Sequence, residues 1–232
     1  MVQKKRLVVL SGAGISAESG IKTFRDSGGL WEGHDVMEVA SPEGWRKNQE
    51  LVQDFYNQRR KQAQSCQPNL AHQILAELES ELEVIIITQN VDDLHERAGS
   101  THVLHLHGEL TKAQSSIDPE LIYELDHWQI RKGDLCEKGS QLRPFIVWFG
   151  ELVPKMIESI QHTRTSDFFL VVGTSLQVYP AAGLLDYAPI SAEIFLIDPD
   201  TLFKNRRGRV NLIPEKATLG IEIFKKLILD KI

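Results

Sequence analysis

The chain begins with a glycine-rich segment whose residue types and spacing are suited to holding a phosphate. Gly12-Ala13-Gly14-Ile15-Ser16-Ala17 has the pattern G-x-G-x-x-A and directly follows the apolar run Leu7–Leu10. Bare backbone N–H groups at such a turn can bind a pyrophosphate, because glycine allows close approach and a positive φ. A tight connection without a ligand would have the same pattern, so the other polar groups have to decide between the two.

The continuation of this loop differs from that of a dinucleotide-binding dehydrogenase. There, a helix leads to a second strand that ends in an acidic residue about 20 residues later. Here the helix is interrupted at once by Thr23-Phe24-Arg25-Asp26. A better candidate for a ribose-binding acid is Asp198, which follows the apolar run Ile194–Ile197. Gly173-Thr174-Ser175, which follows another apolar run, is a second candidate phosphate or ribose loop.

Two further groups could carry out acid–base chemistry. Thr88-Gln89-Asn90-Val91-Asp92 follows the run Val84–Ile87, and His107-Gly108 follows Val103–Leu106. Polar side chains at strand ends are costly to bury without partners and usually face a cleft. A histidine there is well placed as a general base near neutral pH.

Each of these residues also has a simpler interpretation. Asp92 could cap a helix, and any single histidine could be hydrogen-bonded within the core. We expect His95, His102 and His105 to be structural histidines of this kind.

The elements that would position these groups form an alternating pattern. Short, β-branched or aromatic apolar runs are typical of buried parallel strands, and segments with helical periodicity lie between them. The predicted strands are Leu7–Leu10, Val84–Ile87, Phe168–Val172 and Ile194–Ile197, with Phe145–Phe149 and Val103–Leu106 as further candidates. The predicted helices include Glu50 to about Gln62, a segment from Leu70 to Leu78 and a closing helix over Leu219–Ile232. This order predicts a Rossmann-like, doubly wound α/β fold.

Two segments interrupt the alternation. Residues 31–67 are predicted to be helical without a strand, and residues 111–143 are polar with no clear strand. We therefore expect a single domain over residues 1–232, in which these two insertions form a small, helical, metal-free module beside the sheet.

Composition limits the class of protein. A formal charge of −6 argues against a nucleic-acid-binding surface, and the basic run Lys204–Arg209 is interpreted as a solvated loop. Cys66 and Cys136 cannot form a disulfide framework, and no apolar run is long enough to span a membrane. These features lead us to expect a monomeric cytoplasmic protein with no nucleic-acid or membrane partner.

Taken together and in order, the motifs resemble those of the sirtuin family over most of the chain. The matching stretches are Gly12–Ile21, Thr23-Phe24-Arg25, Gly29-Leu30-Trp31, Thr88–Asp92, Leu94-His95, His107-Gly108, Ile146–Glu151 and Gly173–Val178. The resemblance implies an NAD-dependent enzyme that removes acyl groups from lysine side chains of proteins or peptides. The products would be free lysine, nicotinamide and O-acyl-ADP-ribose.

The resemblance also implies roles for individual residues. His107 would be the catalytic base, with Asn90 and Asp92 positioning the nicotinamide carboxamide and a water. The NAD-binding residues would be Gly12, Ala13, Gly14, Ser16, Ile21, Phe24, Arg25, Asp26, Gln89, Asn90, Asp92, Gly173, Thr174, Ser175 and Asp198. At Asp198 the family commonly has asparagine, and either side chain can bond a ribose hydroxyl. The acyl-lysine tunnel would be bordered by Val147, Phe149, Gly150 and Glu151.

One pair suggests the acyl group. Tyr56 and Arg59 share a helix face and resemble the Tyr-x-x-Arg pair of sirtuins that accept malonyl, succinyl or glutaryl lysine. A guanidinium and a phenol can bind a distal carboxylate through charge-assisted hydrogen bonds. The alternative is a core tyrosine beside a solvated arginine.

A zinc site is not expected. Most sirtuins bind structural zinc through two cysteine pairs in the stretch matching Thr111–Arg143, where this chain has only Cys136. His127 would add at best one further ligand to the four that a structural zinc takes. We expect an apolar cluster of Leu121, Ile122, Leu125 and Trp128, at helical spacing, to replace the metal.

Two other functions are compatible with an NAD site. The chain could transfer ADP-ribose to a protein acceptor, and the presence of Glu109 or Glu151 does not distinguish such a transferase from a deacylase. Alternatively, it could sense NAD or ADP-ribose without catalysis. His107 together with Asn90 and Asp92 argues against a sensor, because binding alone does not require a base.

Overall fold

The centre of the molecule is a six-stranded parallel sheet built from the buried apolar runs. The computed structural model describes residues 4–22, 30–31, 33–200 and 210–232. In spatial order the strands are β11 (Val210–Ile213), β10 (Glu193–Ile197), β9 (Phe168–Val172), β1 (Arg6–Ser11), β4 (Glu83–Thr88) and β5 (Val103–His105). The four principal predicted strands and the strand beginning at Val103 are confirmed.

The strand order places a switch point beside β1. The chain runs from β1 to β4 and β5 on one side, then returns to pair β9 with the other edge of β1 and continues outward to β10 and β11. The doubly wound fold class is therefore confirmed. In sheets of this kind ligands bind beyond the carboxyl ends of the strands where the order reverses, here between β1 and β9.

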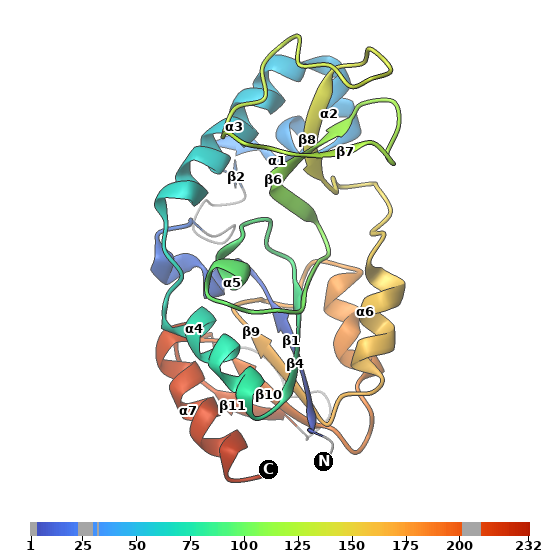
Figure 1. Ribbon diagram of the computed structural model, residues 1–232. Coiled ribbons are helices and arrows are strands. Elements are labelled where there is room, and N and C mark those ends of the chain that lie inside the picture. Colours follow the sequence, from blue (N-terminus) through green and yellow to red (C-terminus); the bar gives the residue numbers. More distant parts are fainter. Residues whose placement is uncertain (1–3, 23–29, 32, 201–209) are drawn as a thin grey trace.

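Helices cover both faces of this sheet (Figure 1). On one face α4 (Leu70–Glu77) and α7 (Ala217–Leu229) pack against inward residues such as Val9 and Leu170. On the other, α6 (Met156–Thr163) and the 3-10 helix η5 (Ala181–Tyr187) pack against the alternate residues. Both faces are thus buried, which explains why the strands show continuous rather than alternating hydrophobicity.

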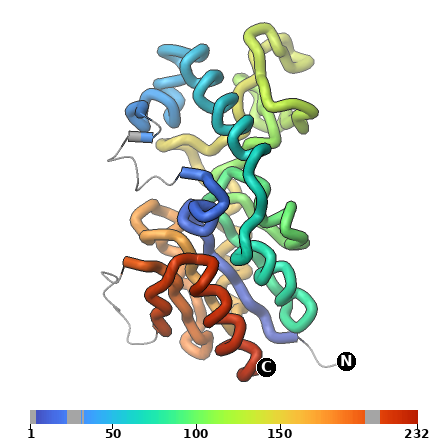
Figure 2. The backbone as a smooth tube through the Cα atoms, turned by 90° about the vertical axis from the view of Figure 1, so that its left-hand side faces the viewer, coloured from blue at the N-terminus to red at the C-terminus, as the bar shows by residue number. Residues whose placement is uncertain are grey.

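A smaller module lies beyond the carboxyl end of the sheet, at the top of Figure 1. Its helices are α1 (Val36–Val39), α2 (Pro42–Lys47) and α3 (Gln49–Ser65), and its strands are β2 (Leu30–Trp31), β3 (His34–Asp35), β6 (Gly108–Ser115), β7 (Ile122–Glu124) and β8 (Leu142–Ile146). Its core combines Tyr56 and Phe55 of α3 with Trp148 and Trp45. Figure 2 shows the segments of α3 and of the inserted strands lying together at this end of the molecule.

Several sequence predictions about this module are wrong. Residues 111–143 contain strands, because β6 pairs antiparallel with both β7 and β8 in a three-stranded sheet. The proposed helical cluster around Ile122 does not exist, since Ile122 lies in β7 and is 44% exposed. The strand predicted over Phe145–Phe149 instead spans Leu142–Ile146 and belongs to the small sheet. Finally, residues 31–67 contain the short β2–β3 hairpin in addition to helices.

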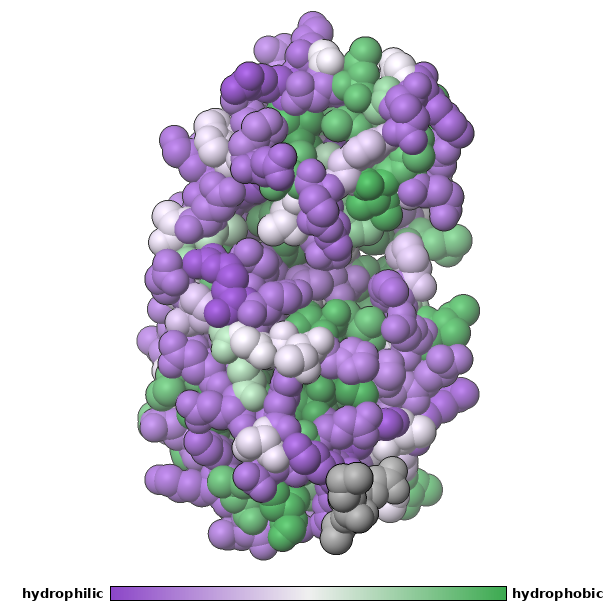
Figure 3. All heavy atoms as spheres, in the orientation of Figure 1, coloured by the Kyte–Doolittle hydropathy of each residue, from purple (hydrophilic) through white to green (hydrophobic). Residues whose placement is uncertain are grey.

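The surface facing the viewer in Figure 3 is mainly hydrophilic and is notched at one side between the small module and the sheet domain. Among the described residues, none of the helices combines the length and apolar character needed to cross a membrane.

Candidate active site

Two loops interlock at the switch point. The amide of Gly12 donates to the carbonyl of Val172 at 3.0 Å, and the amide of Gly14 donates to the carbonyl of Gly173 at 2.8 Å. A Cβ on Gly14 would lie 2.7 Å from the Cα of Gly173, and one on Gly12 would lie 2.6 Å from the Cβ of Thr174. Such distances are too short for real Cβ atoms, so glycine is required for the two loops to touch.

This packing adds a reason for the glycines that the sequence did not indicate. The amides of Ile15 and Ser16 also donate to carbonyls within the loop, where Ala13–Ile15 forms the 3-10 helix η1. The amides of residues 12, 14, 15 and 16 are therefore already hydrogen-bonded inside the protein. In this structure the glycines allow the loop after β1 to pack directly against the loop after β9.

Polar side chains link these loops to their neighbours. Gln89, just after β4, donates from Nε2 to Oγ1 of Thr174 at 3.0 Å. Ser175, the next residue, is half-buried. Asp198 follows β10 and is only 5% exposed, with one carboxylate oxygen accepting from the amide of Asp200 at 2.8 Å. Asp198 thus lies at the carboxyl edge of the sheet, as predicted.

A buried amide and carboxylate lie beside the glycine loop. Asn90 donates from Nδ2 to Oγ of Ser16 at 3.1 Å, and Ser16 in turn donates to Asp92 at 3.2 Å. All three residues are at most 6% exposed. Burial raises the pKa of Asp92, and the hydrogen bonds from the Leu94 amide and from Ser16 act in the opposite direction. The structure therefore brings Ser16, Asn90 and Asp92 together.

His107 follows β5 and is fixed by the same segment. Its Nδ1 lies 3.1 Å from the carbonyl oxygen of Gln89, and a carbonyl can only accept, so Nδ1 carries the proton. In the neutral ring Nε2 is then an acceptor. Burial lowers the pKa of His107, while the hydrogen bond to Gln89 partly opposes this. The arrangement favours a neutral imidazole that can take up a proton.

The glycine after His107 fixes the direction of the chain. Gly108 has a φ of +84°, and a Cβ there would lie 2.1 Å from the carbonyl oxygen of Phe145 in β8. The amide of Val147 donates to the carbonyl of His107 at 2.9 Å. The segment after β8 therefore runs directly beside the candidate base.

Two buried histidines lie beneath this cluster. His72 of α4 and His95 of α5 (Leu94–Arg97) have ring centroids 4.9 Å apart and are at most 1% exposed. His72 lies 3.4 Å from Ser16 Oγ, and His95 lies 3.0 Å from Ser11 Oγ. Burial lowers the pKa of His72 to about 4 and that of His95 well below its usual value.

The buried position of His95 agrees with the structural role predicted for it. His72 was not among the histidines predicted to have such a role. The available signal was a histidine among the apolar residues Ala71, Ile74 and Leu75 on one helix face, which also fits an ordinary core position.

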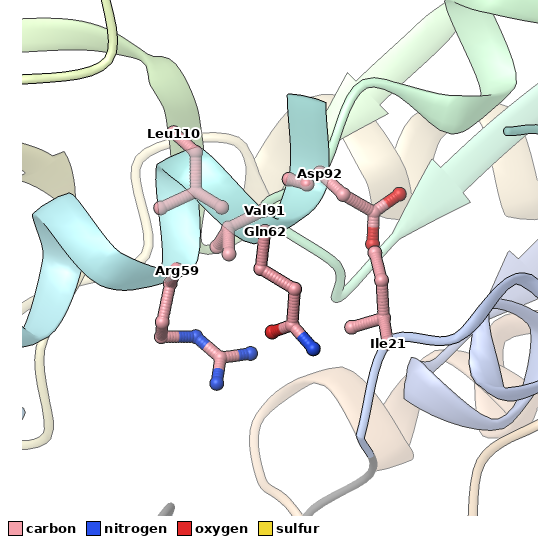
Figure 4. Close-up of a pocket in the computed structure, with 7 residues that line it drawn as sticks. Ile21, Arg59, Gln62, Val91, Asp92 and Leu110 are labelled. Carbon is pink, nitrogen blue, oxygen red and sulfur yellow. The ribbon is translucent and has the colours of Figure 1, made fainter. Parts of the chain in front are cut away.

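A narrow pocket opens between the small module and the sheet (Figure 4). Arg59 and Gln62 extend from α3 into one space, and Ile21 lies across from them. The other residues that line the pocket are Ala63, Val91, Asp92 and Leu110. Arg59 also lines a second, open pocket along α3 with Phe55 and Gln58. The side chains of Arg59 and of the candidate catalytic residue Asp92 thus line the same pocket.

The two residues of the Tyr-x-x-Arg pair have different environments. The Arg59 guanidinium stacks over Trp31, with 4.6 Å from Cζ to the ring centroid. Tyr56 is fully buried, and its hydroxyl accepts from Nε1 of Trp148 at 3.2 Å. Burial raises the pKa of Tyr56, so its hydroxyl stays protonated. Tyr56 is absent from the linings of both pockets.

The predicted tunnel residues follow β8. Phe149 is 45% exposed, Val147 is half-buried, and Gly150 has a positive φ of 90°. Glu151 differs from them, because its carboxylate accepts from the Trp148 amide at 2.8 Å and from Arg143 at 3.0 Å. Glu151 therefore holds the turn of this segment.

Three predicted cofactor residues, Phe24, Arg25 and Asp26, lie outside the described residues. The region where zinc was considered contains Cys136, which is buried with its sulfur 3.2 Å from Ser140 Oγ. In the part of the chain that the structure describes, no group of three or more His, Cys, Asp or Glu side chains is arranged to hold a metal. The absence of zinc stays a prediction.

Comparison with known proteins gives a consistent result. The model of the Sir2 family matches residues 12–180. An NAD-dependent protein deacylase of Bacteroides thetaiotaomicron is 51% identical over 230 residues, covering 97% of this chain and 98% of the relative. One of Helicobacter pylori, with the same description, is 56% identical over 225 residues, with coverage of 97% and 98%.

Solved structures agree with these relatives. A Sir2 homologue in complex with NAD has a TM-score of 0.87 and 38% identity, covering 98% of this chain and 91% of that one. A mutant Sir2 homologue in complex with ADP-ribose has a TM-score of 0.86 and 37% identity, with coverage of 98% and 93%.

Proposed function

Because the chain belongs to the Sir2 family and is an NAD-dependent protein deacylase, we propose roles for its site residues and the class of acyl group that it removes. NAD supplies an ADP-ribosyl acceptor for the acyl group, with nicotinamide as the leaving group. The site suits this cofactor, since the glycine loop contacts Gly173 and the buried acid Asp198 ends the adjacent strand. The substrate would be an acylated lysine of a protein or peptide.

We propose His107 as the general base. The observation that carries this role is the hydrogen bond from Nδ1 to the Gln89 carbonyl, which leaves Nε2 as the acceptor in a ring whose pKa is lowered by burial. A base of this kind is already unprotonated at neutral pH and can accept a proton from a hydroxyl group held against it.

Asn90 and Asp92 would orient the nicotinamide and ribose end of NAD. Ser16 supports both side chains, since it accepts a hydrogen bond from Asn90 and donates one to Asp92. Side chains held in this way need little reorganisation when a ligand binds, which favours catalysis. The residues Gly12, Ala13, Gly14, Gly173, Thr174 and Ser175 would border the phosphates and the adenosine half. The amides of Gly12 and Gly14 already donate to Val172 and Gly173, so these two glycines would leave room for the ligand rather than donate to it.

Arg59 would bind the distal carboxylate of malonyl- or succinyl-lysine. This proposal is supported by the position of the Arg59 side chain, which lines the same pocket as Asp92 and Val91. Tyr56 would act through packing, because its hydroxyl bonds Trp148, which directly precedes the tunnel residue Phe149. We therefore assign the carboxylate contact to Arg59 and a supporting role to Tyr56, whereas the Tyr-x-x-Arg resemblance implies contacts from both.

The test uses acetyl-, malonyl- and succinyl-lysine peptides with and without NAD. Arg59→Met should lower desuccinylation about 100-fold, as expected for the loss of a charge-assisted hydrogen bond, and change deacetylation less than about 3-fold. Lys61→Met is the matched control, because Lys61 lies on the same helix but stacks over Trp128 away from the pocket. Equal losses toward all three peptides in Arg59→Met would contradict the acyl assignment.

The role of His107 is tested in the same assay. His107→Ala should lose deacylation of every peptide while still binding NAD. Full activity in this variant would contradict the assignment of the base without affecting that of Arg59.

A further inference from the structure

A second histidine, His105, lies on the segment that carries His107 and contacts the loop after β4, residues 88–91, which is called the catalytic loop below. His105 ends β5, two residues before His107, and its Nδ1 lies 2.9 Å from the carbonyl oxygen of Asn90. His107 makes the corresponding contact to the carbonyl of Gln89. Leu106 and Leu110 add backbone bonds, so the carbonyls of residues 88–91 all accept from the segment 105–110. The catalytic loop is thus attached along its length to the strand that delivers the base.

The two histidines differ in what faces the other ring nitrogen. Nε2 of His105 lies 2.7 Å from a carboxylate oxygen of Glu96, which belongs to α5. A carbonyl oxygen and a carboxylate both accept, so a ring that bonds both must carry two protons and a positive charge. The carboxylate of Glu96 is itself favoured, because hydrogen bonding and charge from His105 outweigh burial and lower its pKa.

The surroundings of His105 are compatible with this charge. Its side chain is 7% exposed, and besides Glu96 it interacts electrostatically with the carboxylates of Glu109 and Asp92 and with the ring of His95. Burial lowers the pKa of His105, but the hydrogen bond and charge of Glu96 together raise it overall. The pKa of Asp92 is raised by burial, and the charge of His105 opposes part of that rise.

From this geometry we infer that His105 is a positioning residue for deacylation: as an imidazolium held by Glu96, it fixes the backbone of Asn90. This inference rests on the roles proposed above for Asn90 and Asp92. His105 already uses both ring nitrogens, one on the Asn90 carbonyl and the other on Glu96. It acts through the loop, since a shift of the Asn90 carbonyl would also move the Asn90 side chain away from Ser16.

Matched variants separate the two contacts of the ring. In asparagine the side-chain amide nitrogen takes the place of Nδ1. His105→Asn therefore keeps the hydrogen bond to the Asn90 carbonyl but loses the contact with Glu96. His105→Leu loses both contacts. Glu96→Gln keeps a neutral partner for Nε2, and the folded structure should tolerate this change because the side chain is 40% exposed. His102→Leu is the control for the substitution itself, because His102 is exposed just before β5.

The kinetic test measures kcat and KM for deacetylation and, separately, the exchange of labelled nicotinamide into NAD. Removal of a charged hydrogen bond should lower kcat of His105→Leu about 10- to 100-fold, with KM for peptide changed less than about 3-fold. His105→Asn should recover most of the loss. Nicotinamide exchange should fall together with deacetylation in His105→Leu, because Asn90 and Asp92 act while the nicotinamide bond breaks.

A purely structural role predicts a different pattern. The unfolding temperature would then fall in both His105 variants while kcat per folded enzyme stayed at the wild-type value, and this result would overturn the proposal. In contrast, a fully active His107→Ala would overturn the role of the base and leave the exchange measurement on His105 valid.

The charge is tested without any activity measurement. Nitrogen-15 NMR of the NAD-free protein at pH 7.5 should show both ring nitrogens of His105 protonated, and Glu96→Gln should shift its titration to lower pH. A neutral ring in the wild-type protein would overturn the imidazolium assignment.

Discussion

The buried histidine beneath the glycine loop should make the protein sensitive to mild acid. His72 is fully buried, and burial lowers its pKa from 6.5 to about 4. A histidine with a depressed pKa takes up its proton more readily in the unfolded chain, so stability rises with pH in this range. The free energy of unfolding is therefore unaffected by His72 above about pH 6.5 and decreases as the pH falls toward 4. At about 1.4 kcal/mol per pKa unit, the full decrease in the free energy of unfolding is about 3 kcal/mol.

The pH dependence can be isolated with a variant. We expect the free energy of unfolding in urea, measured without NAD from pH 7.5 to pH 5, to fall by about 2 kcal/mol less in His72→Gln than in wild type. Lost contacts to Ser16 would appear as a constant offset, whereas the titration changes the slope. His95 acts in the same direction and Asp92, with its raised pKa, in the opposite one, but both remain in the variant.

The exposed His127 provides a matched control, and His127→Gln should follow the wild-type curve. Parallel curves for wild type and His72→Gln over this range would refute the reasoning, because they would mean that His72 binds its proton equally in the folded and unfolded chains.

Other predictions follow from the site and the module. The acid limb of kcat/KM should lie below pH 6.5, because burial lowers the pKa of His107 and the base stays neutral until that point; a pH–rate profile measures it. Gly14→Ala should weaken NAD binding more than about 10-fold by calorimetry, since the new methyl group would push Gly173 away. Arg60→Met should lower the free energy of unfolding by about 2–4 kcal/mol in urea, because the carbonyls of Leu110 and Trp128 lose their buried donor. Elemental analysis should find no stoichiometric zinc.

The sheet could be predicted because its strands are buried on both faces. Runs such as Val84–Ile87 and Phe168–Val172 are continuous and apolar, and each is followed by residues of the candidate site. β11 has no such signal, since Asn211 and Leu212 are exposed at the edge of the sheet. The same holds for β6, whose polar sequence is stabilised by pairing with β8 about thirty residues later, a contact that local periodicity cannot reveal.

The candidate site was predictable to a similar degree in its arrangement. Asn90, Asp92 and His107 could be proposed because polar residues at strand ends stand out against apolar surroundings, and their catalytic roles stay predictions. The link from Ser16 to His72 and on to His95 could not, because positions on three separate elements are related only after α4 and α5 pack together. The environment of Tyr56 was beyond prediction for the same reason, since it depends on Trp148, 92 residues away.

The interlock between the glycine loops has a consequence for biosynthesis. The loop after β1 is made first, yet the amides of Gly12 and Gly14 donate to carbonyls of Val172 and Gly173, about 160 residues later in the chain. A nascent chain that ends before β9 therefore has the complete glycine motif but lacks the surface on which that motif closes. Because such distant contacts form slowly, the NAD site should be among the last parts to mature. Acquisition of NAD binding during refolding would thus report that both halves of the sheet have joined.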